Sequence, residues 1–283
     1  MKLVSFLKNG NPSWGIWRDD GIVDVGAQKA ADYPTLKSAL ASLEDAIQDC
    51  DGAARLAHDS VVLLPPVPDP GCIVCVGLNY KTHIAETGRE PPQYPMLFAR
   101  YPDSIVGSNN ALIRPIASHN FDFEGELAFI VGKGGRHIAK EDALDHVAGF
   151  ACFNDGSIRD WQRHTSQFMP GKTFWRSGSF GPWLVTPDET GPIGDLSLVT
   201  RLNGAEMQRA TLDDLLFGVP ELIAYLSTIM PLQPGDVVAT GTTGGVGCFR
   251  EPPLWMNPGD VVEVEIDRLG TLINTIDDEA IGE

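Results

Sequence analysis

Short apolar segments separated by glycine and proline turns are the feature that most constrains the fold of this chain. Helical periodicity is confined to residues 34–47, residues 140–148 and a segment that begins at Pro220, where proline suits the first turn of a helix. Strand-like segments are more numerous and lie at residues 73–78, 111–114, 124–131, 150–154, 183–186, 198–203, 237–240 and 261–266. Because strands and helices do not alternate regularly, a doubly wound sheet is disfavoured, and the sequence predicts a β-rich α+β fold.

A proline-rich segment divides the chain into two unequal parts. LLPPVPDPG, residues 63–71, holds four prolines in nine residues, which is typical of a stiff linker. We therefore expect a small N-terminal α+β domain at residues 1–65 and a larger domain at residues 66–283.

Charge and composition limit the partners and the compartment. The net charge is −17, the pI is about 4.6, and no Lys/Arg cluster offsets this acidity, so we expect no nucleic-acid partner. Because this net charge repels anions, an anionic substrate would need positively charged groups close to its binding site. We find neither a signal peptide nor the ~18 apolar residues of a membrane span, so we expect no membrane partner and a cytoplasmic protein.

Cys72 and Cys75 have CxxC spacing inside an apolar run, where we favour buried strand thiols over a redox or zinc site.

An acidic strand suggests a metal site. In FDFEGELAF, residues 121–129, apolar and acidic side chains alternate with the period of a strand, which places Glu124 and Glu126 on one face. A solvated acidic face is the simple alternative, but the flanking apolar residues indicate burial, where the pair needs a counter-charge. Asp155 ends another apolar run and completes a set of three carboxylates suited to Mg²⁺ or Mn²⁺.

Cations and amides suited to an anionic substrate follow Asp155. Arg159 and Gln162 are one helical turn apart, and Lys172 stands in MPGKTF. The GKT of this segment imitates a P-loop, but the first glycine is missing, so we reject nucleotide binding. An acidic protein needs such groups to hold an anion beside a metal. Solvated surface charges are the alternative.

Two further segments offer a base and a binding loop. His83 and Glu86 share one face if their segment is helical, and a carboxylate beside an imidazole raises its basicity and orients it. A surface pair is the alternative. The turn-rich residues 87–92 follow, so we expect this pair on a lid. In the glycine-rich loop at residues 240–247, backbone amides and the Thr242 hydroxyl could approach a small carboxylate, although a plain tight turn fits equally.

Six motifs together resemble the fumarylacetoacetate hydrolase family over residues 70–275. They are GLNYKTHIAE, FDFEGELAFIVG, FNDGSIRDWQ, the lysine of PGKTF, NGAEMQ and PGDVVATGTTGGVG. The resemblance implies a mixed β-sandwich roll, a homodimer and one divalent metal ion per subunit. By carry-over it implies metal ligands at Glu124, Glu126 and Asp155, catalytic residues at His83, Glu86 and Lys172, and substrate contacts at Arg159, Gln162 and Thr242. The family's TGTP reads TGTT here, so we expect Thr243 to give a looser loop.

The resemblance also implies the reaction. We expect metal-dependent hydrolysis of the C3–C4 bond of a 2,4-dioxo acid, such as an acylpyruvate like fumarylpyruvate or a 2,4-diketo-3-deoxy sugar acid, to pyruvate and a carboxylic acid. His83, oriented by Glu86, would take a proton from water, and Lys172 would stabilise the pyruvate enolate. An oxaloacetate-type decarboxylase, a hydratase or isomerase of 2-oxo acids, and a protein that binds without turnover remain as alternatives.

Overall fold

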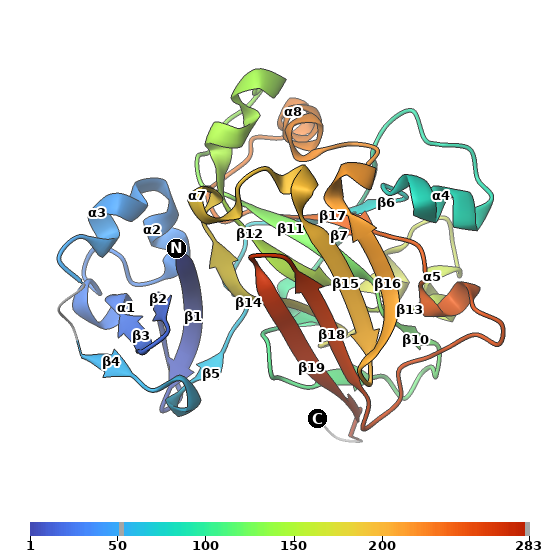
Figure 1. Cartoon of the computed structure of the whole chain (residues 1–283), viewed down its shortest axis with the longest axis horizontal. Coiled ribbons are helices and arrows are strands. Elements are labelled where there is room, and N and C mark those ends of the chain that lie inside the picture. Colours follow the sequence, from blue (N-terminus) through green and yellow to red (C-terminus); the bar gives the residue numbers. More distant parts are fainter. Residues whose placement is uncertain (51–53, 281–283) are drawn as a thin grey trace.

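The computed structural model describes residues 1–50 and 54–280, and strands dominate it (Figure 1). The strands are β1 (Lys2–Lys8), β2 (Asn11–Arg18), β3 (Gly21–Asp24), β4 (Arg55–Leu56), β5 (Val62–Leu63), β6 (Ile73–Gly77), β7 (Met96–Arg100), β8 (Ile105–Val106), β9 (Leu112–Arg114), β10 (Phe121–Asp122), β11 (Gly125–Val131), β12 (Val147–Asn154), β13 (Ser157–Ile158), β14 (Gly178–Val185), β15 (Ser197–Leu202), β16 (Ala205–Thr211), β17 (Val237–Thr242), β18 (Val261–Ile266) and β19 (Gly270–Asp278). The α-helices are α1 (Val25–Gln28), α2 (Leu36–Ala39), α3 (Leu43–Ile47), α4 (Lys81–Thr87), α5 (Arg159–Gln162), α6 (Met169–Lys172), α7 (Pro187–Thr190) and α8 (Val219–Ile229). The 3-10 helices are η1 (Leu40–Ser42), η2 (His58–Ser60), η3 (Pro102–Ser104), η4 (Lys140–His146), η5 (Ile193–Asp195), η6 (Leu212–Asp214) and η7 (Gly247–Phe249).

The largest sheet runs through the whole molecule. Its strand order is β4-β3-β2-β1-β14-β12-β11-β17-β6-β7, with β5 paired to β1 and β8 paired to β14. Every residue of β11 is buried, so this central strand packs on both faces, and its sequence contains hardly any polar residue. The pairing of β17 with β6 is parallel, so their carboxyl ends meet at the same edge of the sheet.

A second sheet covers one face of the first. Its order is β16-β15-β18-β19-β9, and it lies across the strands of the first sheet (Figure 1). Its inward side chains Leu198 and Val264 share a buried cluster with Leu127 and Phe129 of β11. Alternate residues point into this layer because side chains on a strand have a period of two. The chain is therefore a β-rich mixed sandwich, and the predicted α+β fold class is confirmed.

The N-terminal strands extend the main sheet. β1 pairs antiparallel with β14, with Lys2 opposite Val185 and Leu3 opposite Leu184. Side chains of the N-terminal part, including Trp14 and Leu36, share one buried cluster with residues on the second face of the central strands. We keep the division into residues 1–65 and 66–283 as a proposal.

Several expected elements differ from the observed ones. The helix expected at residues 34–47 is broken into α2, η1 and α3, because the backbone of Ser42 leaves the helical region at φ −145° and ψ 48°. Residues 140–148 form the 3-10 helix η4 and then enter β12, where the carbonyl oxygen of His146 already accepts from the amide of Gly132 at 2.8 Å. Strands β7, β16 and β19 were not expected, whereas the helix at Pro220 is present as α8.

Two expectations about composition can be compared with the described residues. Cys72 and Cys75 are free thiols, Cys75 is buried in β6, and burial raises the pKa of Cys72 to about 12. None of the helices in residues 1–50 and 54–280 combines the length and the apolar character needed to cross a bilayer.

Candidate active site

Three carboxylates meet where the acidic segment changes from one strand to another. The strand expected over residues 124–131 starts at Gly125, because the amide of Glu124 donates to the side chain of Asn154 at 3.0 Å instead of joining a ladder. The amide of Asp155 donates to the carbonyl oxygen of Glu124 at 2.9 Å. Glu126 follows on β11, and one ligand oxygen from each of the three acids lies within 4.8 Å of the others. Local backbone pairing therefore assembles Glu124, Glu126 and Asp155.

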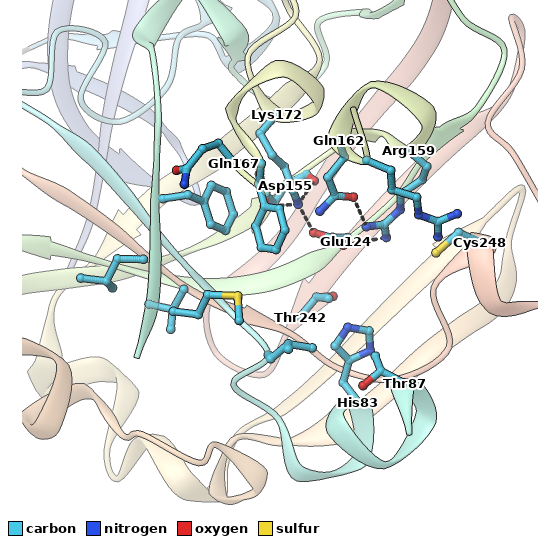
Figure 2. A pocket seen from close by; sticks show the side chains of 18 of the residues that line it. His83, Thr87, Glu124, Asp155, Arg159, Gln162, Gln167, Lys172, Thr242 and Cys248 are labelled. Atoms are coloured by element: carbon cyan, nitrogen blue, oxygen red, sulfur yellow. Dashed lines mark hydrogen bonds and ion pairs between the residues drawn. The ribbon is translucent and has the colours of Figure 1, made fainter. Parts of the chain in front are cut away.

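Three buried cations surround this cluster. Asp155 accepts from Arg100 at 2.5 Å through Oδ1. It also accepts from Lys172 at 2.5 Å through Oδ2 (Figure 2). Lys172 also donates to Glu124, whose other oxygen lies 2.6 Å from Arg159 Nη2. Each cation is buried, so these pairs are poorly screened by water.

The cluster separates the pKa values of its two glutamates. Burial raises the pKa of Glu124, but Arg159 and Lys172 outweigh it and lower the pKa to about 2. Burial, together with the charges of Asp155 and Glu124, raises the pKa of Glu126 well above its usual value. In the described part of the chain, Glu126 forms no ion pair with a Lys or Arg side chain, and its Oε2 accepts only from the amide of Gly241 at 2.9 Å. A buried, oxygen-only set with one uncompensated carboxylate fits a divalent cation.

A cavity of about 810 Å³ opens above the carboxylates. His83 on α4 faces it from the side opposite Lys172 and Arg159 (Figure 2). His83 Nδ1 lies 2.9 Å from Glu86 Oε2, which leaves Nε2 as the nitrogen available to a ligand. Burial opposes the ionised form of Glu86, but its bonds from His83 and from the amide of Gly245 lower its pKa. The ionised carboxylate therefore orients the imidazole.

Helix α4 is short and is held by its surroundings. It ends at Gly88, which adopts φ 66°, a left-handed conformation that glycine reaches without a steric penalty. Near its start, the amide and the hydroxyl of Thr82 donate to Asp214 at 3.1 and 2.6 Å. At its other end, Glu86 Oε1 accepts from the amide of Gly245 at 2.9 Å. These bonds link α4 to η6 and to the loop after β17, and a role of α4 as a lid stays a prediction.

All nine residues singled out in the sequence lie at this one place. Eight of them line the cavity, namely His83, Glu124, Glu126, Asp155, Arg159, Gln162, Lys172 and Thr242. Glu86 reaches the cavity only through His83. The structure thus brings the set together, while the role of each member stays a prediction.

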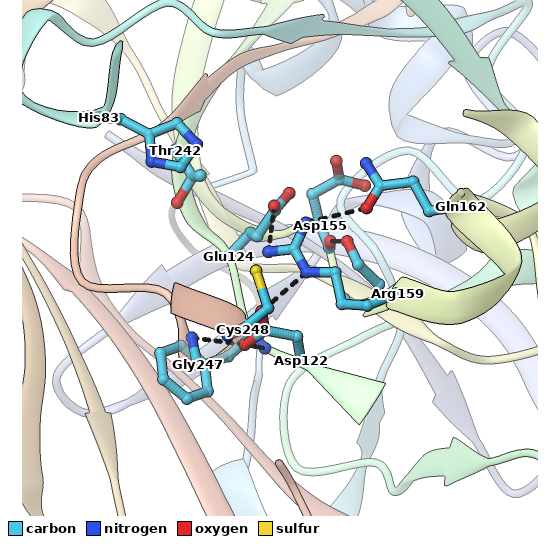
Figure 3. Close-up of polar contacts among 12 residues, drawn as sticks. His83, Asp122, Glu124, Asp155, Arg159, Gln162, Thr242, Gly247 and Cys248 are labelled. Atoms are coloured by element: carbon cyan, nitrogen blue, oxygen red, sulfur yellow. Dashed lines mark hydrogen bonds and ion pairs between the residues drawn. The ribbon is translucent and has the colours of Figure 1, made fainter. Parts of the chain in front are cut away.

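The sequence reasoning missed two charged residues beneath the cavity. Arg100, at the end of β7, had no local signal, since its partner Asp155 lies 55 residues further along the chain, directly after β12. Asp122 was visible as a third acid of the acidic segment but received no role. It accepts from Arg159 Nε at 2.7 Å and from the amides of Gly247 and Cys248 at 2.8 and 3.0 Å (Figure 3). Asp122 therefore ties Arg159 to the loop after β17.

The sequence profile described as "Fumarylacetoacetate (FAA) hydrolase C-terminal" matches residues 72–277. The chain belongs to the fumarylacetoacetate hydrolase family.

Relatives in this family carry names from more than one reaction class. The chain is 37% identical over 287 residues to "Oxaloacetate tautomerase fahd2, mitochondrial" of Xenopus laevis, which covers 98% of this chain and 90% of that protein. Among solved structures, a fumarylacetoacetate hydrolase from Exiguobacterium antarcticum has a TM-score of 0.88 and 35% identity, and covers 99% of this chain and 100% of that one. Maleylpyruvate hydrolase from Sphingobium sp. SYK-6, described in complex with manganese(II) and pyruvate, has a TM-score of 0.82 and 28% identity, with 99% and 100% coverage.

Thr243 lies in the loop where the resemblance in the sequence led us to expect a proline. The looser loop expected there stays a prediction, and the structure shows that Gln208 Nε2 donates to Thr242 Oγ1 at 2.8 Å and to the carbonyl oxygen of Thr243 at 3.0 Å. The Thr242 hydroxyl in turn donates to the carbonyl oxygen of Gly125 at 2.9 Å. Both threonines are buried, so the side-chain amide of Gln208 holds the loop from within the protein.

Proposed function

We propose that this chain is an isomerase that interconverts the enol and keto forms of a 2-oxo acid, with oxaloacetate as the favoured substrate. The sequence led us to expect hydrolysis first and isomerisation as an alternative. The relative named as an oxaloacetate tautomerase supports the alternative, because it is 37% identical to this chain along 98% of its length. The maleylpyruvate hydrolase is less similar, at 28% identity.

The observation that carries this proposal is the placement of one oriented base across the cavity from a buried ammonium group. His83 is held by Glu86 through Nδ1. Lys172 lies in the opposite wall, and although burial opposes its charge, Asp155 and Glu124 outweigh burial and raise its pKa. A 2-oxo acid between them meets a proton acceptor on one side and a positive charge on the other.

His83 and Lys172 account for every proton and electron pair that moves in the tautomerisation. In the keto to enol direction, His83 Nε2 takes a proton from C3, and the electron pair of that C–H bond forms the C2=C3 double bond. The carbonyl π pair moves to the oxygen on C2, where the Lys172 ammonium stabilises the negative charge until a proton returns to that oxygen. No water is consumed, and the reverse direction uses the same groups.

The other residues suit binding and orientation. Glu124, Glu126 and Asp155 would hold Mg²⁺ or Mn²⁺, which when bound would act as a Lewis acid toward the carboxylate and the 2-oxo group. Gln162 Oε1 accepts from Arg159 at 3.0 Å, and no described residue accepts from its Nε2. That amide N–H is therefore available to a substrate oxygen, and we assign substrate contacts to Gln162, Arg159 and Thr242.

The test follows the enol directly. Freshly dissolved enol-oxaloacetate loses its ultraviolet absorbance as it converts to the keto form, malate dehydrogenase traps the keto product, and lactate dehydrogenase reports any pyruvate. We expect faster enol loss without pyruvate, abolished by EDTA and restored by Mg²⁺ or Mn²⁺. An enol decay equal to that of the metal-containing buffer would refute the isomerase, and pyruvate formed at the rate of enol loss would indicate a decarboxylase instead.

Hydrolysis of a 2,4-dioxo acid is the second candidate. It is favoured by the intact pair of His83 and Glu86, because such a base could equally take a proton from water. Pyruvate release from an acylpyruvate separates it from the isomerase. The homodimer and the cytoplasmic location expected from the sequence belong to this proposal as well, and neither depends on which reaction is correct.

A further inference from the structure

Gln208 is not among the described residues that line the cavity, but its side chain binds the backbone of two segments that do. It lies on β16 of the second sheet, it is buried, and it ends the NGAEMQ motif, which has no role in the proposed function. Its Oε1 accepts from the amide of Gly125, the residue between the two glutamates of the cluster, at 2.9 Å. Its Nε2 donates to Thr242 Oγ1 at 2.8 Å and to the carbonyl oxygen of Thr243 at 3.0 Å.

Backbone groups determine which end of this side-chain amide faces which partner. The amide of Gly125 can only donate, so it requires the oxygen of Gln208. The carbonyl oxygen of Thr243 can only accept, so it requires the nitrogen. The reversed amide would place two donors together at Gly125 and two acceptors together at Thr243. Gln208 Nε2 is therefore the group that faces Thr242.

The same network occupies the only hydrogen of the Thr242 hydroxyl. A hydroxyl group has one hydrogen to donate and two lone pairs that accept. Thr242 accepts from Gln208 with one lone pair and donates its hydrogen to the carbonyl oxygen of Gly125 at 2.9 Å. Thr242 also lines the cavity, on the same side as His83 in Figure 2 and Figure 3. Among the described residues no other group binds this oxygen, so one lone pair is left for a ligand, and that ligand has to donate.

The two tautomers of the proposed substrate differ in this respect. At neutral pH both carboxyl groups of oxaloacetate are ionised, so they only accept hydrogen bonds, and the keto oxygen also only accepts. The enol has one hydroxyl group, on C2, and this group is its only donor. An acceptor held against the free lone pair of Thr242 would leave both groups without a partner, which is unfavourable at a buried site.

We propose that Gln208 is a positioning residue that fixes the Thr242 hydroxyl as an acceptor toward the cavity, so that the site favours the enol over the keto form. This inference rests on the proposed function, because it takes the enol of a 2-oxo acid as the ligand. The oxygen on C2 then lies between Lys172, which donates to it, and Thr242, which accepts its hydrogen. Gln208 and Thr242 select and orient the enol, while proton transfer at C3 belongs to His83.

Two ligands of equal chain length and equal charge test this polarity. Pyruvate has an oxo group on C2 and lactate has a hydroxyl group there, and both can be titrated by calorimetry in the presence of Mn²⁺. Lactate therefore takes the place of the enol as a donor. Thr242→Val keeps the shape of the side chain and removes its oxygen. It should weaken lactate binding about three- to tenfold, the usual effect of one neutral hydrogen bond, and leave pyruvate binding unchanged or tighter.

Gln208→Met tests the positioning role. The new side chain has a similar length but cannot donate to Thr242, so the hydroxyl loses the partner that fixes its orientation. The ratio of the two dissociation constants should shift toward pyruvate by at least about threefold. In the enol assay, the KM for enol-oxaloacetate should rise by a larger factor than kcat falls, because binding is affected and the base is not.

A matched control removes a buried hydroxyl from the same strand. Thr240 Oγ1 donates to the carbonyl oxygen of Leu127 at 3.0 Å, and Thr240 is not among the described residues that line the cavity. Thr240→Val should therefore lower the melting temperature without changing the ratio of the two dissociation constants. If Thr242→Val does not fold, Thr242→Ala, which leaves room for a water molecule, is measured in the same way.

Two results would overturn the proposal. A Thr242 variant that loses as much affinity for pyruvate as for lactate, or more, would mean that the hydroxyl donates to the ligand. A Gln208→Met protein that melts cooperatively and keeps the wild-type ratio would mean that Gln208 does not set the orientation.

Failure of this inference and failure of the proposed isomerase give different results. If the variants weaken lactate binding alone but wild type does not accelerate the decay of the enol, the polarity of Thr242 stands and the isomerase is refuted. If wild type accelerates the decay of the enol but the variants affect both ligands alike, only the positioning role is refuted.

Discussion

Glu126→Gln tests whether the carboxylate cluster is assembled at the expense of stability. The three acids place ligand oxygens within 4.8 Å of one another. At an effective dielectric of about 20, one such pair of like charges repels by roughly 3.5 kcal/mol. Proton uptake by Glu126 relieves part of this repulsion, so we use the figure for one pair as the order of magnitude of the gain. Gln keeps an oxygen that can accept from the amide of Gly241 and removes the charge.

We expect opposite effects with and without metal. Without metal, Glu126→Gln should melt at least as high as wild type and up to about 7 °C higher, at about 2 °C per kcal/mol for a chain of this size. A ligand present at 100 times its dissociation constant stabilises by about 2.7 kcal/mol, which is about 5 °C here. Saturating Mn²⁺ should therefore raise the melting temperature of wild type by about 5 °C and that of the variant by much less. Calorimetric melting after EDTA treatment, with and without Mn²⁺, measures both.

The effect also has a defined pH dependence. Burial and the neighbouring acids raise the pKa of Glu126, so above its ordinary value of 4.5 the folded protein binds more protons than the unfolded chain. The free energy of unfolding of wild type therefore falls as pH rises through that window. Gln does not titrate, so the advantage of the variant should vanish near pH 4 and grow toward neutral pH.

A control variant at an exposed glutamate shows how much the melting temperature changes when one negative charge is lost from the surface. Glu141 is exposed at the start of η4, and Glu141→Gln should change the melting temperature little at any pH. A metal-free Glu126→Gln protein that melted several degrees below wild type at neutral pH would refute the reasoning. It would mean that the carboxylate stabilises the fold through contacts that Gln cannot replace.

Three further outcomes are expected. His83→Ala should lower kcat about 10²- to 10⁴-fold, which is the usual contribution of a general base. The affinity for oxalate, measured by calorimetry, should change little. A variant that turned over at the wild-type rate would exclude His83 as the base. Asp122→Asn removes a buried charge that faces Arg159 Nε, so the free energy of unfolding measured in urea should fall by about 3 kcal/mol. An unchanged free energy of unfolding would contradict the pairing. Light scattering at micromolar concentration should give a mass near twice 30.6 kDa, and a single-chain mass would contradict the dimer.

The parts of the site that the sequence could predict are those with a local pattern. Asp155 was recognisable because it ends an apolar run, and β12 does end at the preceding residue. The period of two placed Glu124 and Glu126 on one face, although the break before Gly125 could not be seen. That break depends on Asn154, whose side chain occupies the amide of Glu124 from another strand.

The parts that could not be predicted depend on contacts between distant segments. Arg100 lies 55 residues before Asp155 in the chain, and nothing around it marks a buried ion pair. Residues 140–148 have the composition of a helix, but pairing of His146 with Gly132 draws the chain into β12. The role of Gln208 in fixing the loop at Thr243 likewise required the second sheet to be in place.

The pairing of β1 with β14 has a consequence for any shortened form of the protein. A chain that began after the proline-rich segment would leave part of β14 as an unpaired edge, with Val185 and Leu184 deprived of their partners. It would also uncover the apolar face of β11 behind the carboxylates, where Ala128 and Ile130 are covered in the intact protein. Such a fragment is expected to aggregate, so the described part of the first 65 residues supports the sheet that carries the carboxylates without contacting the cavity.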